Sequence, residues 1–478
     1  MNYSMIRYTL GWILRFEAIF LLLPLITAIY YGESAILAFS LSIAIALLVG
    51  IPLALKKPAQ TTIYAKDGFV IVALSWIVLS LFGSFPFLIS GATGSFVDAL
   101  FETVSGFTTT GASIFNTVED LPRSILMWRS FTHWIGGMGV LVFVMAFLPL
   151  GGGQNMHIMR AESPGPSVSK LVPRVKYTAI ILYIIYFALT VIMFVSLLIS
   201  GMNVFESINT AFSTAGTGGY GFKNDSFASA TVTQQIIVTV FMLIFSVNFN
   251  SYYLLLRGKL RDAINTEVIA FIVIVVSAVT IITFDIMGSC RNVGDAINQA
   301  AFSVASLIST TGFTTANFDL WPELSKSVLV MVMFIGACAG STGGGIKVSR
   351  ILILIKGIGR EIATLIHPRQ VKKITIDRRP VEHEVIRSVN AYIACYFVIF
   401  AASLILLSFD KFDLVTTFTS AVATLNNVGP GLADVGPVSN YSAFTPFSKI
   451  VLIFNMLAGR LELFPMLLLF SPATWRKT

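Results

Sequence analysis

Charged residues are scarce in this chain. Of its 478 residues, 12% are Asp, Glu, Lys or Arg and 55% are hydrophobic, whereas a soluble globular protein carries about 25% charged residues. So little charge over the whole length excludes a soluble enzyme and a disordered protein. The composition instead predicts an all-α polytopic membrane protein, because apolar segments of about 20 residues can each cross a bilayer.

Cysteine and histidine are also rare. The three cysteines, Cys290, Cys338 and Cys395, are too far apart for a CxxC metal pair and too few for a disulfide framework. Four scattered histidines argue against a metal cluster. The sequence has no Walker A motif, no GxGxxG unit and no plausible nucleophile–base pair. We therefore expect a protein that is not an enzyme and has no covalent cofactor.

Ten apolar segments are long enough to cross the bilayer core of about 30 Å. They lie at residues 11–31, 35–55, 69–89, 124–148, 177–200, 234–256, 268–287, 326–349, 388–408 and 447–470. Four further apolar segments are too short to cross, and each ends in small or polar residues: 96–107, 205–215, 295–308 and 413–425. A short helix that enters the membrane and returns must line water or be buried in protein.

Basic residues mark one side of the membrane. Residues 347–387 hold ten Lys or Arg and four acidic residues, a net charge of +6. Acidic residues predominate in the loops on the other side. The positive-inside rule therefore places both termini in the cytoplasm and the four short segments outside. This topology in the cytoplasmic membrane accounts for the total charge of +8, so a nucleic-acid partner is not expected.

A glycine-containing loop follows each of the four short segments. Aligned on Gly111, Gly218, Gly312 and Gly429, the loops are 107, 94 and 117 residues apart, and each lies between two long apolar segments. Such internal repetition predicts a unit of span, short helix, loop and span that occurs four times. The predicted division is two extra N-terminal transmembrane helices and four pore repeats, at residues 1–68, 69–176, 177–266, 267–386 and 387–478.

Four such loops in one chain suit a potassium filter. A filter replaces the hydration shell of the ion with rings of backbone carbonyls, and glycine adopts the necessary backbone angles without steric cost. The short helices would direct their partly negative C-terminal ends toward the centre. The alternative is four turns that only close one face of the protein. The predicted ion-binding residues are Thr109, Thr110, Gly111, Thr217, Gly218, Gly219, Thr310, Thr311, Gly312, Asn427, Val428 and Gly429.

Several segments resemble the Trk/Ktr/HKT superfamily of potassium transporters, most closely its bacterial TrkH/TrkG branch. The resemblance covers nearly the whole chain and includes VSGFTTTGAS (104–113), WRSFTHWIGGMGV (128–140), RAESPGP (160–166), STTGFTT (309–315), AGSTGGGIK (339–347), ATLNNVGPGL (423–432) and AGRLELFP (458–465). It implies potassium uptake, with potassium preferred because Gly111 stands where sodium-selective plant relatives have serine. It also implies a homodimer that binds a cytoplasmic nucleotide-binding subunit of the RCK type, similar to TrkA. Residues 347–387 would form part of the docking face, and the nucleotide would bind only to that partner.

A gate is predicted below the loops. Residues 340–345 interrupt an apolar segment with four glycines, and each glycine costs about 1 kcal/mol in a helix relative to alanine. We expect an intramembrane loop there, with close helix packing through small residues as the alternative. The resemblance assigns this loop as a gate, formed by Gly340, Ser341, Thr342, Gly343, Gly344 and Gly345.

Arg460 lies within the last apolar segment, where an isolated charge indicates a functional residue. In relatives the matching arginine projects into the pore, which makes Arg460 part of the predicted gate; the alternative is an ion pair with Glu462. Arg15, Arg129 and His133 are attributed to snorkelling near span ends and are given no role. The functional alternative is a sodium-permeable or proton- or sodium-coupled potassium symporter of the same fold.

Overall fold

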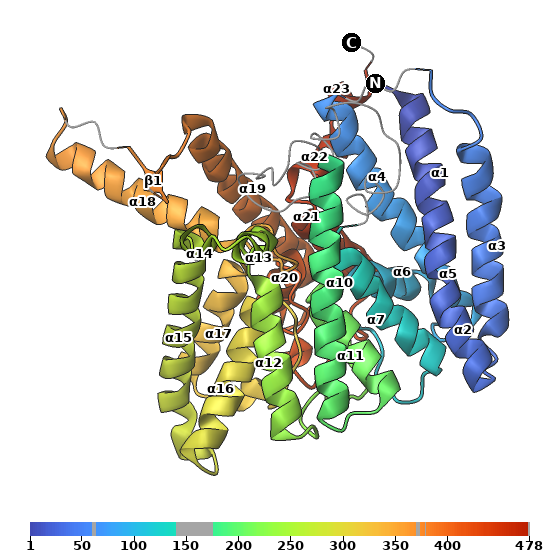
Figure 1. Cartoon of the computed structure of the whole chain (residues 1–478), viewed down its shortest axis with the longest axis horizontal. Coiled ribbons are helices and arrows are strands. Elements are labelled where there is room, and N and C mark those ends of the chain that lie inside the picture. Colours follow the sequence, from blue (N-terminus) through green and yellow to red (C-terminus); the bar gives the residue numbers. More distant parts are fainter. Residues whose placement is uncertain (60–63, 140–174, 370–372, 378, 477–478) are drawn as a thin grey trace.

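The computed structural model describes residues 1–59, 64–139, 175–369, 373–377 and 379–476. These residues form an all-α protein with one small antiparallel hairpin, in which β1 (Thr375–Ile376) pairs with β2 (Arg379–Pro380). The two termini lie at the same end of the molecule, as Figure 1 shows. The predicted fold class is therefore confirmed, whereas the division into repeats at particular residues stays a prediction.

Within the described residues, six helical segments are long and apolar enough to span a membrane, and they coincide with six of the ten predicted spans. Large apolar side chains such as Ile184, Phe187 and Phe284 are exposed on them, as expected for surfaces that face lipid. The six segments are α1 (Tyr3–Phe20) with α2 (Leu22–Tyr31), α3 (Ile36–Leu53), α4 (Ala65–Gly83) with α5 (Phe85–Ile89), α10 (Val175–Ile199), α15 (Thr266–Ile286) and α19 (His383–Leu407).

Three of the other predicted spans, 234–256, 326–349 and 447–470, are broken helices, and only the break within 326–349 was predicted, from its glycine run. The first bends by 91° between two helices, and irregular backbone interrupts the other two. Hydrophobicity predicts that a segment avoids water, but it does not predict whether the helix is continuous. A broken helix is tolerated within a membrane where the surrounding protein satisfies the freed backbone groups. The helix pairs are α12 (Val232–Ser246) with α13 (Phe249–Leu256), α17 (Glu323–Ile335) with α18 (Val348–Ile366), and α21 (Pro446–Arg460) with α22 (Phe464–Phe470).

The remaining predicted span, 124–148, begins as α7 (Arg123–Gly137). Residues 140–148 lie outside the described residues, as does the RAESPGP motif at 160–166. The shorter elements are α14 (Leu260–Ala263), α23 (Pro472–Trp475), η1 (Met287–Ser289), η2 (Phe318–Leu320), η3 (Ser408–Asp410) and η4 (Ala433–Val435).

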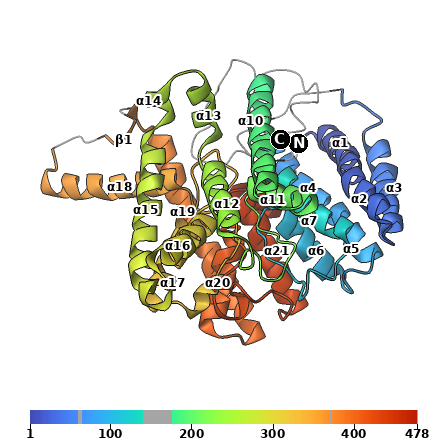
Figure 2. The same ribbon diagram turned by 60° about the horizontal axis from the view of Figure 1, so that its bottom comes forward.

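All four predicted short helices are present: α6 (Phe96–Phe107), α11 (Val204–Gly216), α16 (Val293–Ile308) and α20 (Leu414–Leu425). Side chains of Asn203, Asn292 and Asp413 cap three of them by accepting hydrogen bonds from the first turn. Three of the short helices pack on the helix that follows the short helix of the preceding predicted repeat: α11 on α7, α16 on α12, and α20 on α17. The first short helix, α6, packs on α21 of the last predicted repeat. The last pair closes a ring around the middle of the protein (Figure 2).

Candidate ion-binding site

The four short helices end in the same way. The N–H of the residue after the last turn donates to the carbonyl three residues earlier in the chain. The N–H of the next residue donates to the carbonyl five residues earlier. This pair of hydrogen bonds is a Schellman motif. The longer bonds measure 2.8–2.9 Å and run from Thr110 to Ser105, Gly218 to Ser213, Thr311 to Ser306 and Val428 to Ala423. Four helix ends of identical geometry therefore start the four predicted filter loops.

Backbone angles align the loops and correct the predicted register. A left-handed residue occurs in each loop at Thr109, Thr217, Thr310 and Asn427, with φ of 54°, 55°, 60° and 55°. A second positive φ follows two residues later at Gly111, Gly219, Gly312 and Gly429, with φ of 78°, 79°, 85° and 97°. The equivalent of Gly111 is thus Gly219, and the alignment on Gly218 was wrong by one residue. Two adjacent glycines made both registers possible in the sequence.

The four glycines meet their neighbours in a closed ring. A Cβ atom added to Gly111 would collide with the Gly218 carbonyl oxygen of the next loop. The same collision occurs between Gly219 and the Thr311 oxygen, Gly312 and the Val428 oxygen, and Gly429 and the Thr110 oxygen. Each glycine therefore leaves room for a carbonyl of the following loop, and the fourth contact returns to the first loop. Four independent turns would not account for this ring.

The left-handed threonines carry backbone strain. Left-handed geometry costs an L-residue roughly 1–2 kcal/mol and is unusual for a β-branched side chain. All three threonines are fully buried, and hydrogen bonds hold the fourth position: Asn427 Nδ2 donates to Thr110 Oγ1 and to the Met456 carbonyl, both at 2.9 Å. Strain of this kind is retained where a site needs a particular backbone shape.

A cavity of about 150 Å³ lies against the ring, and all four ring glycines line it. Its wall also contains Asn116, Asn224 and Asn440, together with Lys223. The cavity therefore places polar side chains beside the four ring glycines.

Residues 336–347 form the irregular loop that the glycine run predicts, and this loop contacts two of the four predicted filter loops directly. Gly344 N donates to Thr310 Oγ1 at 2.6 Å, and Gly345 N donates to the Asn426 carbonyl at 3.0 Å. Close packing also occurs, because a Cβ on Gly343 would lie 2.6 Å from Ala337 Cβ. The small residues thus pack tightly within a loop and not between straight helices.

The same loop fills the bend between α12 and α13. Cys338 N donates to the Ser246 carbonyl at 3.0 Å, Phe249 N donates to the Gly340 carbonyl at 3.0 Å, and Thr342 Oγ1 donates to the Phe245 carbonyl at 3.1 Å. The ring has four quarters, each formed by one short helix, its loop and the helix that follows. The loop of residues 336–347 therefore contacts the quarter that contains α11 and α12.

Arg460 ends α21 and joins this loop to α7. Its guanidinium donates to the Thr342 carbonyl at 2.9 Å, to the Gly137 carbonyl at 2.8 Å and to the Gly136 carbonyl at 2.5 Å. Glu462 instead pairs with Arg350, so the alternative of an Arg460–Glu462 ion pair was wrong. With Arg460, the loop contacts elements from all four quarters of the ring.

Two residues counted as cytoplasmic loop charges are buried beneath the loop. Lys347 is 2% exposed, and its ammonium group donates to the Gly343 carbonyl. Arg350 is 5% exposed, and its guanidinium carbon lies 3.9 Å from the centroid of the Tyr392 ring. Glu267 accepts from Ala339 N at 2.7 Å. Lys347 and Glu267 therefore hydrogen-bond to the loop and help to hold it in place. The buried Lys347 and Arg350 contribute little to the exposed basic surface.

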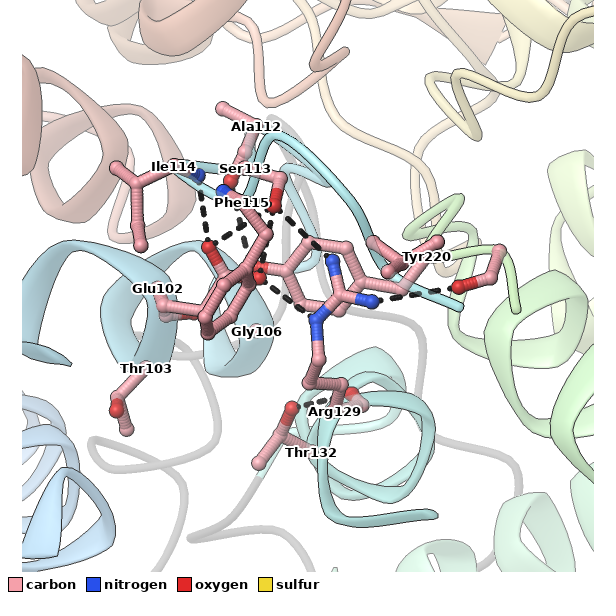
Figure 3. Close-up of polar contacts among 12 residues, drawn as sticks. Glu102, Thr103, Gly106, Ala112, Ser113, Ile114, Phe115, Arg129, Thr132 and Tyr220 are labelled. Atoms are coloured by element: carbon pink, nitrogen blue, oxygen red, sulfur yellow. Dashed lines mark hydrogen bonds and ion pairs between the residues drawn. The ribbon is translucent and has the colours of Figure 1, made fainter. Parts of the chain in front are cut away.

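The prediction missed a polar cluster behind the ring, which Figure 3 shows. Arg129 and His133 are 2% and 0% exposed, so snorkelling was the wrong explanation for both; Arg15 remains partly exposed and donates to the Ile51 carbonyl. Arg129 forms an ion pair of 2.7 Å with Glu102. The signal in the sequence was an acidic residue inside a short apolar helix, followed by an arginine inside the next apolar segment.

Known proteins resemble the chain over its whole length. The family model described as TrkH, cation transport protein, matches residues 35–262 and 260–477. The Trk system potassium uptake protein TrkH of Salmonella typhimurium is 37% identical over 469 residues, 96% of each chain, and that of Halomonas elongata is 34% identical over the full length of both chains. The crystal structure of the potassium transporter TrkH from Vibrio parahaemolyticus matches with a TM-score of 0.89 and 33% identity, again over both full lengths. The chain therefore belongs to the TrkH family of cation transport proteins.

Proposed function

We propose that this protein takes up potassium through the ring of four loops. The observation that carries the proposal is the closed ring in which each glycine meets a carbonyl of the next loop. Relatives of 34–37% identity are named as Trk system potassium uptake proteins, which supports the same cargo here. Potassium is the transported substrate, and the twelve predicted loop residues would bind it during passage.

Selectivity would arise at the loop carbonyls. An ion that leaves the cavity beside the ring exchanges its water shell for backbone oxygens, and the C-terminal ends of α6, α11, α16 and α20 add partial negative charge. The hydrogen bonds of Asn427 and the buried threonines would keep these oxygens in place. Because carbonyl position decides which ion is coordinated, a rigid ring favours potassium over the smaller sodium ion.

The gate in this proposal is the loop of residues 336–347 together with Arg460. Its support is position: the loop hydrogen-bonds two filter loops directly and reaches the other two quarters through the α12–α13 bend and Arg460. In this proposal the linked segments would cross the axis below the ring. Opening would require the loop to leave these contacts, and the arginine charge would oppose a cation until then.

We place both termini and α18 on the cytoplasmic side. Helix α18 projects from the bundle at the end where the termini lie (Figure 1). One face of it exposes Ile355, Ile358, Ile362 and Leu365, each 53–82% accessible. Such a helix suits contacts with a second copy of the chain and with an RCK-type regulatory subunit similar to TrkA, on which any nucleotide would bind.

Ion flux into liposomes tests the function. Purified protein should carry rubidium, as a potassium substitute, much faster than sodium, and a pH gradient should leave this flux unchanged. Equal rubidium and sodium flux would support the sodium-permeable alternative. Uptake that stops when the pH or sodium gradient is removed would support the coupled symporter and contradict a gated passive pathway.

A further inference from the structure

We propose that Glu102, Arg129 and Tyr220 are positioning residues that hold the first two filter loops at the spacing needed to select the ion. The first loop comprises residues 108–115 and the second loop comprises residues 217–221. The inference rests on the proposed filter and adds the residues that set its geometry. It concerns side chains that lie behind the ring and do not touch the ion.

The centre of the cluster is a buried ion pair. Glu102 Oε1 lies 2.7 Å from Arg129 Nε, and the two side chains are 0% and 2% exposed. In each of the other four ion pairs between described residues, the side chain of one partner is at least 21% exposed. A fully buried charged pair is costly to desolvate, so its presence beside the ring calls for a specific role.

Glu102 holds the outer part of the first loop. Its Oε2 accepts from Ile114 N at 3.0 Å, and both carboxylate oxygens lie within 3.2 Å of Ser113 Oγ. Ser113 and Ile114 follow Gly111 by two and three residues. The carboxylate thus ties the loop back to α6, the helix that leads into it (Figure 3).

Arg129 and Tyr220 extend the clamp to the second loop. Arg129 Nη1 donates to the Gly221 carbonyl at 3.3 Å, and its guanidinium carbon lies 4.1 Å from the centroid of the Tyr220 ring. The Tyr220 hydroxyl lies 2.8 Å from the Glu102 carbonyl oxygen and 3.2 Å from that of Ala112. The cluster therefore joins the residues that directly follow the ring glycines of two neighbouring loops.

This clamp is specific to one side of the ring. In the register given by the backbone angles, the residues equivalent to Glu102 are neutral: Thr210, Ser303 and Ser420. The other short helices therefore carry no acidic residue at this position. A change at Glu102 should move two of the four loops and distort the ring, without acting on all four loops equally.

Glu102→Gln removes the clamp with the smallest change of shape. Both carboxylate oxygens accept hydrogen bonds, from Arg129 Nε on one side and Ile114 N on the other. Glutamine has one acceptor oxygen and one NH2 group, so either orientation of the amide places a donor against a donor. The first loop or the arginine must then shift.

The experiment compares Glu102→Gln with Asp98→Asn. Asp98 lies on the same helix and pairs with Lys449 at 2.6 Å, so the control is the same acid-to-amide change away from the ring. We expect Glu102→Gln to lower the rubidium-to-sodium flux ratio about tenfold, equivalent to about 1.4 kcal/mol, and Asp98→Asn to leave it unchanged. Tyr220→Phe keeps the ring over Arg129 but loses the hydroxyl contacts, and should lower the ratio by a smaller factor.

The flux ratio and the melting temperature together decide the outcome. A purely structural role would lower both fluxes and the melting temperature while leaving the ratio at the wild-type value, and this result in Glu102→Gln and Tyr220→Phe would overturn the inference. If Glu102→Gln fails to fold, the ratio of Tyr220→Phe decides alone. Wild-type protein that does not prefer rubidium to sodium would instead refute the proposed filter, so the two failures are distinguishable.

Discussion

Replacing Arg460 with alanine should raise potassium flux and leave selectivity unchanged. The guanidinium remains charged at any physiological pH, and it donates to carbonyls of Thr342, Gly136 and Gly137. The substitution therefore removes the positive charge of the proposed gate and also the link between the loop of residues 336–347 and α7. The ring of carbonyls lies elsewhere, which is why the ion preference should persist.

Both effects can be given a magnitude. A charge about 6 Å from a cation, at an effective dielectric constant of about 20, raises the energy of the ion by about 3 kcal/mol, which slows passage roughly a hundredfold. The bound carbonyls offset part of this barrier. A hydrogen bond to a charged group contributes about 1.5–3 kcal/mol, so losing the bond to Thr342 favours the displaced loop by a factor of about ten or more. We expect a flux increase of at least about tenfold.

Arg460→Lys separates the two effects. Lysine keeps the charge, but its single ammonium cannot reproduce the forked geometry that reaches three carbonyls. If the charge is the barrier, the lysine variant should conduct like wild type while the alanine variant conducts faster. If the link to Thr342 closes the loop, both variants should conduct faster.

The assay is rubidium flux per folded protein in liposomes, measured beside the melting temperature in detergent. An alanine variant that melts like wild type and conducts no faster would refute the gate role of Arg460. Loss of stability and flux together would show that the arginine serves only to hold α21 against α7.

Three further predictions follow from single features. Gly111→Ser should lower the potassium preference, because any Cβ there collides with the Gly218 carbonyl; an unchanged rubidium-to-sodium ratio in a folded variant would contradict this. Deleting residues 340–345 should raise flux with or without a regulatory subunit, and a folded deletion variant that conducts like wild type would favour simple packing. Glu17 is fully buried and neither carboxylate oxygen has a hydrogen-bond partner among the described residues. Glu17→Met should therefore raise the free energy of unfolding by about 1–3 kcal/mol, and a lower melting temperature would disprove it.

The sequence predicted well wherever a signal was local and repeated. Six long apolar segments and four short helices occur close to their predicted bounds, because hydrophobic length and the following Thr, Asn and Gly residues act over one segment at a time. The break at residues 336–347 was predictable for the same reason, since glycines weaken a helix wherever it packs. The bend within 234–256 was not predictable, because nothing in that segment indicates that a loop from another part of the chain fills the bend.

Register within the ring needed the tertiary structure. Gly218 and Gly219 are equally plausible by composition, and only the positive φ of Gly219 and its contact with the Thr311 carbonyl identify it as the ring residue. The same holds for Arg460, whose nearest acidic residue in sequence, Glu462, binds Arg350 instead. Two residues apart on a helix do not face each other, and here the helix ends between them.

The sequence alone therefore determined the class of protein, six of its long helical segments and the four short helices with the glycine-containing loops that follow them, because hydrophobicity, length and glycine spacing are properties of the chain itself. Tertiary structure decided which loop carbonyl meets which glycine, which charges are buried and which partners they take. Glu102 and Arg129 are 27 residues apart, and the Tyr220 hydroxyl comes from 118 residues away. Such contacts depend on how four helix ends converge, and a buried charge can be recognised as part of a site only after its partners are in place.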